Sequence, residues 1–548
     1  MLKREHWNFT RGTLIALGVV FAGAFQTMQA ATICVGTGQG CQTTIGKAVL
    51  AANPGDTIQV GAGTYKEQVT LTSGVLLLGA GSATTIIDAT GLANGVVING
   101  GTPGLSGAGV SGFSIKNANF QGILVENASN VAIWSNQVLN NNVGLNTSSA
   151  SGPTCPGLTP ALDAGEDMDC GEGINLAGAD HSVVSNNVIT GNSGGILISD
   201  DIGATHDNVI TGNVVANNGY ACGITMASHS GMGVYRNTVS NNQSFSNGLK
   251  APGEGAGIGI FAAGPGAQTY SNVVINNVMT NNGLPGVAMH NHAAPMGAPA
   301  VVFNDNKIIG NTISGNGPDV EDTATSGTTG INIFSIAPIT GTVVSQNTIS
   351  NEKLALVFTG PGSVTATLNS FPATTGIDNV GPGTVNGSFN YWGCSTGANS
   401  TGCATIVGTG VSFGAPLPAA FSSSQLPSAP GSTSSGTGTT GGGTGVTPPG
   451  SGMVTVLVTG PAGTGSGTTF QIYSNTITLS AATSTSTNAG ALSYSWTVPQ
   501  GFPTPGILMG NTATPTMQFP KPGTYQFLLT VTDTTGLTGT ATVTVQYI

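Results

Sequence analysis

Two short phrases recur along the chain, and both alternate apolar with polar or small residues. The second phrase is Gly-Ile-x-hydrophobic or a close variant of it. The Asn-rich phrase is seen as NNVITGN (186–192), NVVANN (213–218), NTVSNN (237–242), NNVMTNN (276–282), NTISGN (311–316) and NTISN (347–351). The Gly-Ile phrase is seen as GINL (173–176), GILI (195–198), GITM (223–226), GIGI (257–260), GVAM (286–289) and GINI (330–333). Short alternations bounded by Asn and Gly predict strands and tight turns, not helices.

The spacing of these phrases indicates a repeat architecture. The copies return every two to four dozen residues, with insertions stretching some of them. One strand-and-turn unit cannot bury its apolar side alone, whereas stacked units can. Asn at one recurring turn position suits stacking, because its amide can hydrogen-bond to the copies above and below. The sequence therefore predicts an all-β solenoid.

Two longer stretches carry a family resemblance. PGDTIQVGAGTYKEQVTLTSGVLLLGAG (54–81) resembles the first coils, and FNYWGCSTG (389–397) the closing phrase, of secreted bacterial right-handed parallel β-helix proteins. That superfamily holds pectate lyases, polygalacturonases and periplasmic copper-protein-associated β-helices. The resemblance spans about 43–415 and implies a right-handed parallel β-helix. It does not imply one activity, because this fold hosts many chemistries.

The N-terminal segment has the layout of a signal peptide. Lys3, Arg4 and Arg11 precede the apolar run LIALGVVFAGAF (14–25), and cleavage is expected after Ala30. The apolar run is too short for a membrane span, and nothing later is longer and apolar enough. We therefore expect residues 1–30 to be removed and the protein to be secreted or to lie at the cell surface or in the periplasm.

Composition divides the remainder into three parts. Residues 31–418 form the predicted solenoid, with TTIGKAVLAA (43–52) as a short capping helix opened by Thr. Residues 419–452 are rich in Gly, Ser, Thr and Pro, which is typical of a flexible linker. Residues 453–548 alternate as a small β-sandwich. There, YSWTVP (494–499) and PGTYQFLLTVTD (522–533) resemble a PKD or Ig-like module, which implies binding or spacing, not catalysis.

Charge narrows the partners. Charged residues make up 6% of the chain, and loss of residues 1–30 leaves 8 basic and 21 acidic residues, a formal charge of −13. Such a surface repels nucleic acid and anionic membranes and fits a strongly acidic polymer poorly. A neutral or weakly acidic polysaccharide, or a cell-surface glycan, is the expected partner of a monomer. The sequence requires no cofactor, and calcium is an ion that the carboxylates could hold.

Six of the seven Cys residues form three close pairs. In an exported chain these predict the local disulfides Cys34–Cys41, Cys155–Cys170 and Cys394–Cys403. Cys222 precedes GITM directly and is expected to be a buried thiol. Spacing of the C-x-x-C type is absent, so a structural role is predicted for the Cys residues.

The candidate chemistry lies in the turns after the Gly-Ile strands. The second and fourth residues of each phrase should point inward, so the next residue points outward and the turn follows. The aligned turns are Ser199-Asp200-Asp201, Ala227-Ser228-His229, Phe261-Ala262-Ala263, His290-Asn291-His292 and Phe334-Ser335-Ile336. Asp200, Asp201 and His229 should then share one edge within a single coil step of about 4.8 Å. The bland alternative is that all of these are solvated turn residues.

Three functions compete. The first is a polysaccharide-cleaving hydrolase or lyase, with Asp200, Asp201 and His229 as catalytic residues, one carboxyl acting as acid and the other as base. Its substrate-binding residues would be His206, Phe261, His290, His292 and Phe334. ISDD (198–201) and SHSG (228–231) faintly resemble polygalacturonase motifs, and ATHDN (204–208) resembles a motif of alginate epimerases and lyases.

The second function is a non-catalytic surface or adhesive protein, which suits the linker and the Ig-like tail. The third is a periplasmic metal-binding protein that uses the His cluster with Asp200 or Asp201.

Overall fold

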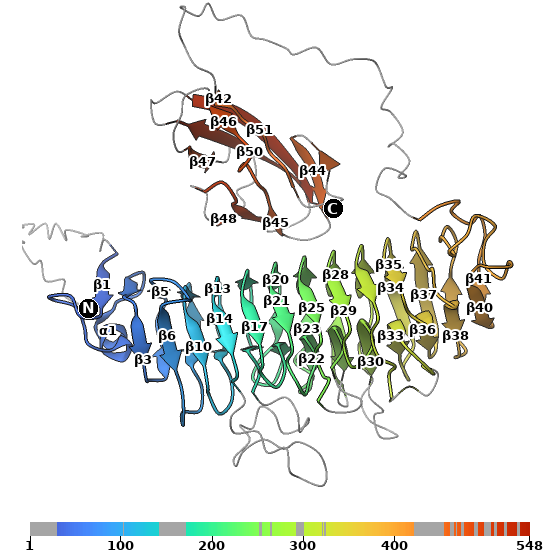
Figure 1. The fold of residues 1–548 in the computed structure, drawn as a ribbon, viewed down its shortest axis with the longest axis horizontal. Helices are drawn as coiled ribbons and strands as arrows, with labels where there is room; N and C mark the ends of the chain where they lie inside the picture. Colours follow the sequence, from blue (N-terminus) through green and yellow to red (C-terminus); the bar gives the residue numbers. More distant parts are fainter. Residues whose placement is uncertain are drawn as a thin grey trace, which may run out of the picture.

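The computed structural model describes most of the solenoid and, separately, the core of a C-terminal domain (Figure 1). The described residues are 30–101, 104–141, 171–250, 255–262, 266–291, 301–320, 322, 325–420, 454–460, 465–466, 468–472, 476–486, 492–497, 506–508, 512–519, 523–533 and 538–547. The predicted signal peptide and the core of the predicted linker therefore lie outside the described residues, as do Cys155, Cys170 and His292.

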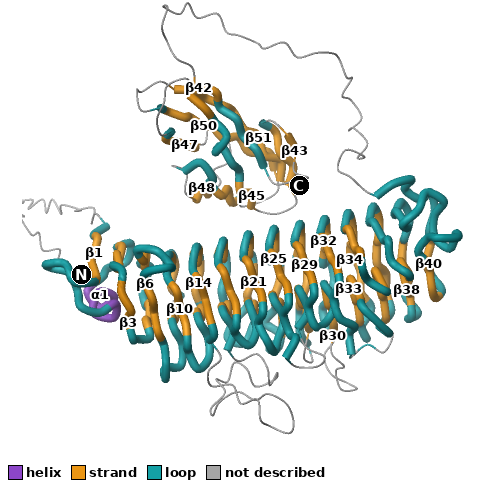
Figure 2. Tube along the Cα trace, in the orientation of Figure 1, coloured by secondary structure: helices purple, strands orange, loops and turns teal. Residues whose placement is uncertain are grey.

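Three long parallel sheets run the length of the solenoid, and each coil contributes a strand to each sheet along most of the stack (Figures 1 and 2). The first sheet has 14 strands: β1 (Thr32–Val35), β2 (Thr57–Val60), β5 (Leu76–Gly79), β9 (Gly109–Ser111), β13 (Ala132–Trp134), β16 (Val183–Ser185), β20 (Val209–Thr211), β24 (Thr238–Ser240), β28 (Val273–Ile275), β31 (Lys307–Ile309), β34 (Ile339–Ser345), β37 (Gly362–Thr367), β39 (Thr384–Asn386) and β41 (Val411–Ser412).

The second sheet has 10 strands: β3 (Gly63–Tyr65), β6 (Thr85–Asp88), β10 (Ser114–Lys116), β14 (Gln137–Leu139), β17 (Val188–Thr190), β21 (Val214–Ala216), β25 (Gln243–Phe245), β29 (Val278–Thr280), β32 (Thr312–Ser314) and β35 (Thr348–Ser350). The third sheet has 12 strands: β4 (Val69–Leu71), β7 (Val96–Asn99), β11 (Ile123–Glu126), β15 (Ile174–Ala177), β18 (Ile196–Ser199), β22 (Ile224–Ser228), β26 (Ile258–Ala262), β30 (Val287–Asn291), β33 (Thr329–Phe334), β36 (Leu354–Thr359), β38 (Thr375–Asn379) and β40 (Thr405–Gly408).

Two small parallel sheets lie between the third sheet and the first. They are the pair β8 (Leu105–Ser106) and β12 (Ala128–Ser129), and the triplet β19 (Thr205–His206), β23 (Val234–Tyr235) and β27 (Thr269–Tyr270). The triplet follows the turns in which the sequence placed its candidate chemistry.

The register of the third sheet confirms the inward positions read from the Gly-Ile phrase. Ile196 pairs with Ile224 and Ile198 with Met226, and all four side chains are fully buried. They belong to one apolar core that continues from coil to coil along the solenoid. The glycine of the phrase is required where the strand begins. A Cβ on Gly195 would stand 2.1 Å from the carbonyl oxygen of Gly223 on the next coil, which leaves no space for a side chain.

The Asn-rich phrase makes two tight turns in each coil. The residue before the buried Asn has a left-handed backbone, for example Asn186 (φ 55°), Gly212 (φ 66°) and Asn241 (φ 55°). Gly and Asn are the residues that adopt this conformation at least cost. The next residue, such as Asn213, turns its amide into the coil and is almost fully buried.

These buried Asn side chains form ladders along the stack. Oδ1 of Asn242 accepts hydrogen bonds from the backbone N and from Nδ2 of Asn213 at 2.9 and 3.0 Å. Nδ2 of Asn242 donates to the carbonyl oxygen of Ile210 and to Oδ1 of Asn277. The longest ladder joins Asn136, Asn187, Asn213, Asn242, Asn277, Asn311, Asn347, Asn369 and Asn390. Each rung thus satisfies the buried polar groups of its neighbours.

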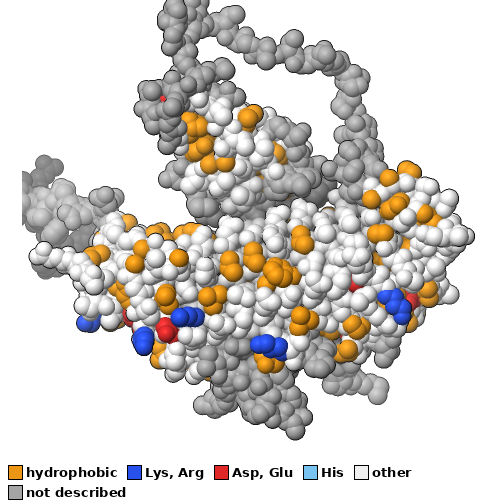
Figure 3. Space-filling model, viewed as in Figure 1, with side chains coloured by type: hydrophobic (Ala, Val, Ile, Leu, Met, Phe, Trp, Pro, Cys, Tyr) orange, Lys and Arg blue, Asp and Glu red, His pale blue; other side chains and the backbone are white. Residues whose placement is uncertain are grey.

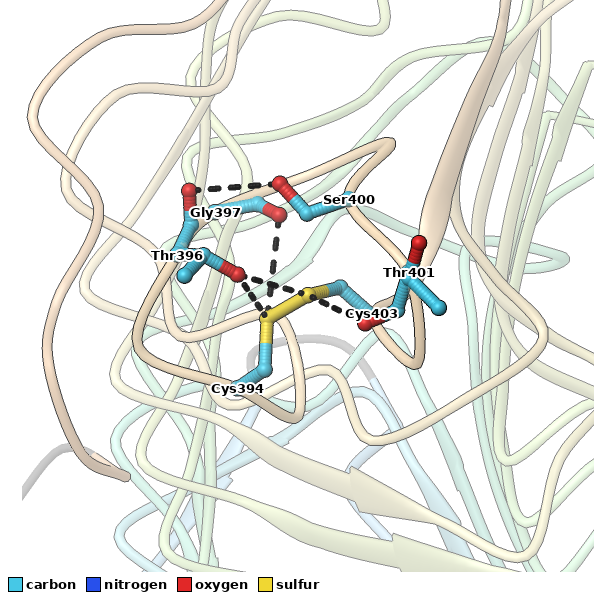
Figure 4. The surroundings of a disulfide bond; sticks show 6 residues. All are labelled: Cys394, Thr396, Gly397, Ser400, Thr401 and Cys403. Atoms are coloured by element: carbon cyan, nitrogen blue, oxygen red, sulfur yellow. Dashed lines mark hydrogen bonds between the residues drawn. A yellow bond between two sulfur atoms is a disulfide. The ribbon is translucent and has the colours of Figure 1, made fainter.

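The two ends of the solenoid are closed as the sequence predicted. The helix α1 (Ile45–Ala51) begins after Thr44, whose side chain accepts a hydrogen bond from the backbone N of Lys47. The disulfides Cys34–Cys41 and Cys394–Cys403 are confirmed, and the second lies in a turn beside Thr396 and Ser400 (Figure 4). Cys222 is a buried thiol outside any disulfide, and its Sγ accepts a hydrogen bond from the backbone N of Ala256.

The C-terminal domain is a β-sandwich with its own core. One sheet holds β43 (Gly465–Ser466), β44 (Thr469–Ile472), β51 (Thr538–Tyr547), β50 (Gly523–Thr532) and β47 (Ser493–Thr497); another holds β45 (Thr476–Thr478), β49 (Thr516–Gln518) and β48 (Gly506–Leu508); β42 (Val454–Thr455) pairs with β46 (Thr485–Ser486). Phe470, Phe519 and Phe527 are fully buried between them. Trp496 is buried as well, and its Nε1 donates to the carbonyl oxygen of Thr512.

Figure 3 shows one face of the molecule, on which charged side chains are sparse. Within the described ranges, no helix has the length and apolarity needed to cross a bilayer. The two disulfides are typical of a protein that folds outside the cytoplasm.

We predict that the ladder contributes strongly to stability. Asn242→Ala leaves two donors of Asn213 and the carbonyl oxygen of Ile210 without their buried partners. The variant should lose at least about 2 kcal/mol of unfolding free energy, since each unsatisfied buried group costs roughly 1–3 kcal/mol. Chemical denaturation measures this, with Gln243→Ala as the control because Gln243 is the next residue and is exposed. Equal midpoints for the two variants would contradict the prediction.

A second prediction concerns the end of a shorter ladder, where Glu352 replaces Asn and accepts two hydrogen bonds from Asn316. Burial raises the pKa of Glu352 from 4.5 to about 7, more than these hydrogen bonds lower it. The folded protein therefore keeps a proton that the unfolded chain releases, and stability falls as pH rises from about 4.5 to 7.

Glu352→Gln removes this titration while keeping the shape of the side chain. At pH 4 the two proteins should be equally stable, and at pH 8 the variant should be more stable by up to about 3 kcal/mol. Unfolding free energies at both pH values test this. A difference that does not change with pH would show that Glu352 does not carry the effect.

Candidate functional site

Asp201 and His229 meet on neighbouring coils, in the turns that follow β18 and β22. Nδ1 of His229 lies 2.8 Å from Oδ1 of Asp201, and the side chains are 15% and 5% exposed, respectively. An ionised carboxylate only accepts hydrogen bonds, so Nδ1 of His229 is the donor. The carboxylate therefore fixes the orientation of the ring and favours the tautomer whose Nε2 can accept a proton.

Asp200 has a different environment from its neighbour. It is fully buried, and its carboxylate accepts hydrogen bonds from the backbone N atoms of His229, Ser230 and Gly233 at 2.7–3.0 Å. The hydroxyl of Ser228 donates a fourth, at 2.8 Å. Burial alone would raise the pKa of Asp200, but these four hydrogen bonds together lower it. Asp200 thus anchors the turn that carries His229.

This placement corrects part of the prediction. Asp200 and Asp201 were expected to be exposed together, to repel each other and to divide into an acid and a base. Instead, the acceptor positions of Asp200 are filled by the turn of the next coil, so no exposed carboxylate pair exists here. The close approach of Asp201 and His229 agrees with the predicted register. The catalytic roles of all three residues stay predictions.

An aromatic strip lies beside this turn, on β19, β23 and β27. The ring of His206 stacks on Tyr235 with centroids 4.8 Å apart, and Tyr235 stacks on Tyr270 at 4.9 Å. All three side chains are partly exposed. Because the rings stack on one another along the solenoid, they present edges and hydroxyl groups outward. The two tyrosines were not predicted, although the aligned phrases THDN (205–208), VYRN (234–237) and TYSN (269–272) place them in the column of His206.

Titratable groups surround the first residue of the strip. Nδ1 of His206 donates to Oδ2 of Asp207 at 2.8 Å, and Nδ1 of the neighbouring His181 lies 2.6 Å from Oδ1 of Asp180. Arg236 binds both oxygens of Asp207 and lies over the ring of Tyr235. Burial would raise the pKa of Asp207, but the hydrogen bonds from His206 and Arg236 outweigh it and hold the pKa well below its usual range.

Phe261, His290 and Phe334 occupy the predicted column of the third sheet but not the predicted surface. Their rings meet edge to face, with centroids 5.8 and 5.9 Å apart. Phe261 and His290 are buried, and Phe334 is partly buried. His290 forms a buried ion pair with Asp319, to which Asn332 also donates. No exposed face of Phe261 or His290 is left for sugar stacking, and their substrate-binding roles remain untested.

The sequence analysis missed Asp319. Its segment, 317–328, lies in a stretch without a repeated phrase, so alignment of the coils could not have placed it. A carboxylate two or three dozen residues from its partner histidine gives no signal at the level of spacing.

Two family descriptions match parts of the chain. Residues 65–248 match the family described as periplasmic copper-binding protein (NosD), and residues 464–546 match a family of PKD domains. The chain therefore combines a NosD-like parallel β-helix with a PKD-like C-terminal domain. No curated protein matches the sequence.

Solved structures similar to the chain include three enzymes. The alginate lyase from Paenibacillus sp. str. FPU-7 is 14% identical, over 70% of this chain and 99% of that one, with a TM-score of 0.40. A mannuronan C-5 epimerase A-module from Azotobacter vinelandii is 16% identical, over 68% and 94%, with a TM-score of 0.41. The catalytic domain of a GH87 α-1,3-glucanase is 13% identical, over 70% and 68%, with a TM-score of 0.44. These activities differ, so the likeness does not select one.

Proposed function

We propose that the solenoid binds a polysaccharide and catalyses proton transfer on it, with His229 as the acid–base residue. The observation that carries the proposal is the hydrogen bond between Asp201 and His229, two largely buried groups on neighbouring coils. A histidine whose Nδ1 is held by a carboxylate is a common general base. In this assignment Asp201 positions His229, and Asp200 holds the turn of His229 against the preceding coil.

The environment of Asp200 favours this chemistry over hydrolysis by two carboxylates. Such hydrolases need one carboxyl to donate a proton while a second activates water or attacks the sugar. Asp200 accepts four hydrogen bonds and its pKa is lowered, so it is unsuited to donate a proton. A single histidine that moves a proton, with the sugar or water as its partner, remains.

Access to His229 requires movement of the turn. Nε2 of His229 is shielded from solvent, so the substrate must open the turn before a proton can transfer. Opening and closing of a loop over a reacting group is a frequent part of catalysis. The nearby edges of Tyr235 and Tyr270 would bind sugar hydroxyl groups along the same side of the solenoid. The acidic chain favours a neutral or weakly acidic polysaccharide.

We predict that turnover depends on the pair and not on the fold around it. His229→Gln should lower kcat by about 10²–10⁴-fold, the usual contribution of a general base. Asp201→Asn should cause a loss of similar order, because an amide can hold the wrong tautomer. The measurement is release of reducing ends from a panel of exported and plant polysaccharides, with Gln243→Ala as the control that keeps full activity.

Product analysis then distinguishes the reactions. Hydrolysis in ¹⁸O-labelled water places the label in the new reducing end, whereas elimination gives an unsaturated, ultraviolet-absorbing sugar without label. Full activity in both His229→Gln and Asp201→Asn would reject the proposal. Binding of a polysaccharide without any turnover by the wild-type protein would favour the adhesive function instead.

A further inference from the structure

We propose that His181, His206 and Asp207 form a binding site for a divalent transition-metal ion such as Zn²⁺ or Cu²⁺. Each of the three residues offers one ligand atom, and these atoms lie within 4.8 Å of one another. The site is separate from Asp201 and His229 and does not rest on the catalytic proposal. It also differs from a metal site at Asp200 or Asp201, since Asp200 is filled by hydrogen bonds and Asp201 holds His229.

The fold fixes where the three residues stand. Asp180 pairs with His206 across one coil step, which brings His181 beside Asp207. His181 and Asp207 both have left-handed backbones, with φ of 50° and 57°. Each is followed directly by a buried rung of a ladder, Ser182 or Asn208, and these two rungs are hydrogen-bonded at 2.9 Å. The backbone of the proposed site is therefore held in place before any ion binds.

Both imidazoles are prepared as ligands. Nδ1 of His181 is held by Asp180, and Nδ1 of His206 is held by Asp207. A carboxylate on one ring nitrogen makes the other nitrogen a better metal ligand, an arrangement found behind most metal-bound histidines. In a tetrahedral zinc site the ligand atoms stand about 3.3 Å apart. The observed upper limit of 4.8 Å thus leaves a contraction that rotation of partly exposed side chains can supply.

The charges around the site favour a cation only in part. Asp180 and Asp207 attract a positive ion, while Arg236 opposes it and occupies both oxygens of Asp207 at 2.8 and 2.5 Å. Arg236 is half exposed and can move away. We infer that the two imidazoles bind the ion first and that Asp207 joins when Arg236 leaves. Imidazole ligands select Zn²⁺ or Cu²⁺ over Ca²⁺, which prefers sites built of oxygen atoms.

The test uses the full exported protein after removal of metal ions by a chelator. Titration calorimetry with ZnCl₂, CuCl₂ and CaCl₂ should show one site for Zn²⁺ or Cu²⁺ and none for Ca²⁺. His181→Gln and His206→Gln should each weaken binding at least tenfold. Arg236→Gln should tighten it several-fold, because the competing charge is gone and Asp207 is released. His229→Gln is the matched histidine control and should bind the ion like the wild-type protein, whatever the outcome for catalysis.

A second measurement needs no variant. Zn²⁺ should protect His181 and His206 of the wild-type protein from modification by diethyl pyrocarbonate, as mapped by mass spectrometry, and should leave His229 unchanged. Unaltered modification at both residues in saturating Zn²⁺ would overturn the proposal. So would folded His181→Gln and His206→Gln variants that bind the ion with wild-type affinity, or equal binding of Ca²⁺.

Discussion

The hydrogen-bonded ladders of buried Asn side chains are the constraint on which the solenoid depends. Each rung satisfies the backbone N of the preceding coil, so no coil can shift along the strand direction without breaking bonds on both sides. Three ladders run together, and their rungs are five residues apart within a coil, as in Asn208, Asn213 and Asn218. The same spacing returns in the next coils, for example at Asn237, Asn242 and Asn247. The ladders therefore keep about ten residues of each coil constant in length. Length can change only in the rest of the coil, where the distance from the last rung to the first rung of the next coil is 19 residues after Asn218 and 25 after Asn247. This variable part contains the third sheet, the turns on either side of it and all the candidate site residues. Binding and catalytic groups commonly sit on variable segments that a rigid scaffold positions, and here the scaffold is the ladder.

Much of this architecture could be predicted because each rule is local. A left-handed turn needs Asn or Gly, and the strand that begins at Gly195 needs a residue without a side chain. The inward direction of Ile196 and Ile198 follows from alternation alone. The capping helix and the disulfides Cys34–Cys41 and Cys394–Cys403 join residues close in sequence, so spacing was enough to find them.

The errors share one physical cause. Alternation gives the direction of a side chain but not what covers it, and the outer face of the third sheet carries its own buried cluster, which includes Leu197, Cys222 and Phe261. For the same reason Asp200 and Asp201 could not be told apart. Their roles depend on backbone N atoms about thirty residues later, which turn toward Asp200.

The three carboxylate–histidine contacts of the solenoid can be ranked by the free energy that burial demands. Removing two charges from water is costly, and a buried ion pair seldom repays that cost unless further hydrogen bonds complete it. His290 and Asp319 are almost fully buried between Phe261 and Phe334, and Asn332 completes them. They are therefore best understood as an anchor for the segment 317–328. Asp201 and His229 are less buried, and His206 with Asp207 less still. Since chemistry needs a group that can change its protonation or its ligand, the two outer pairs are where function should be sought.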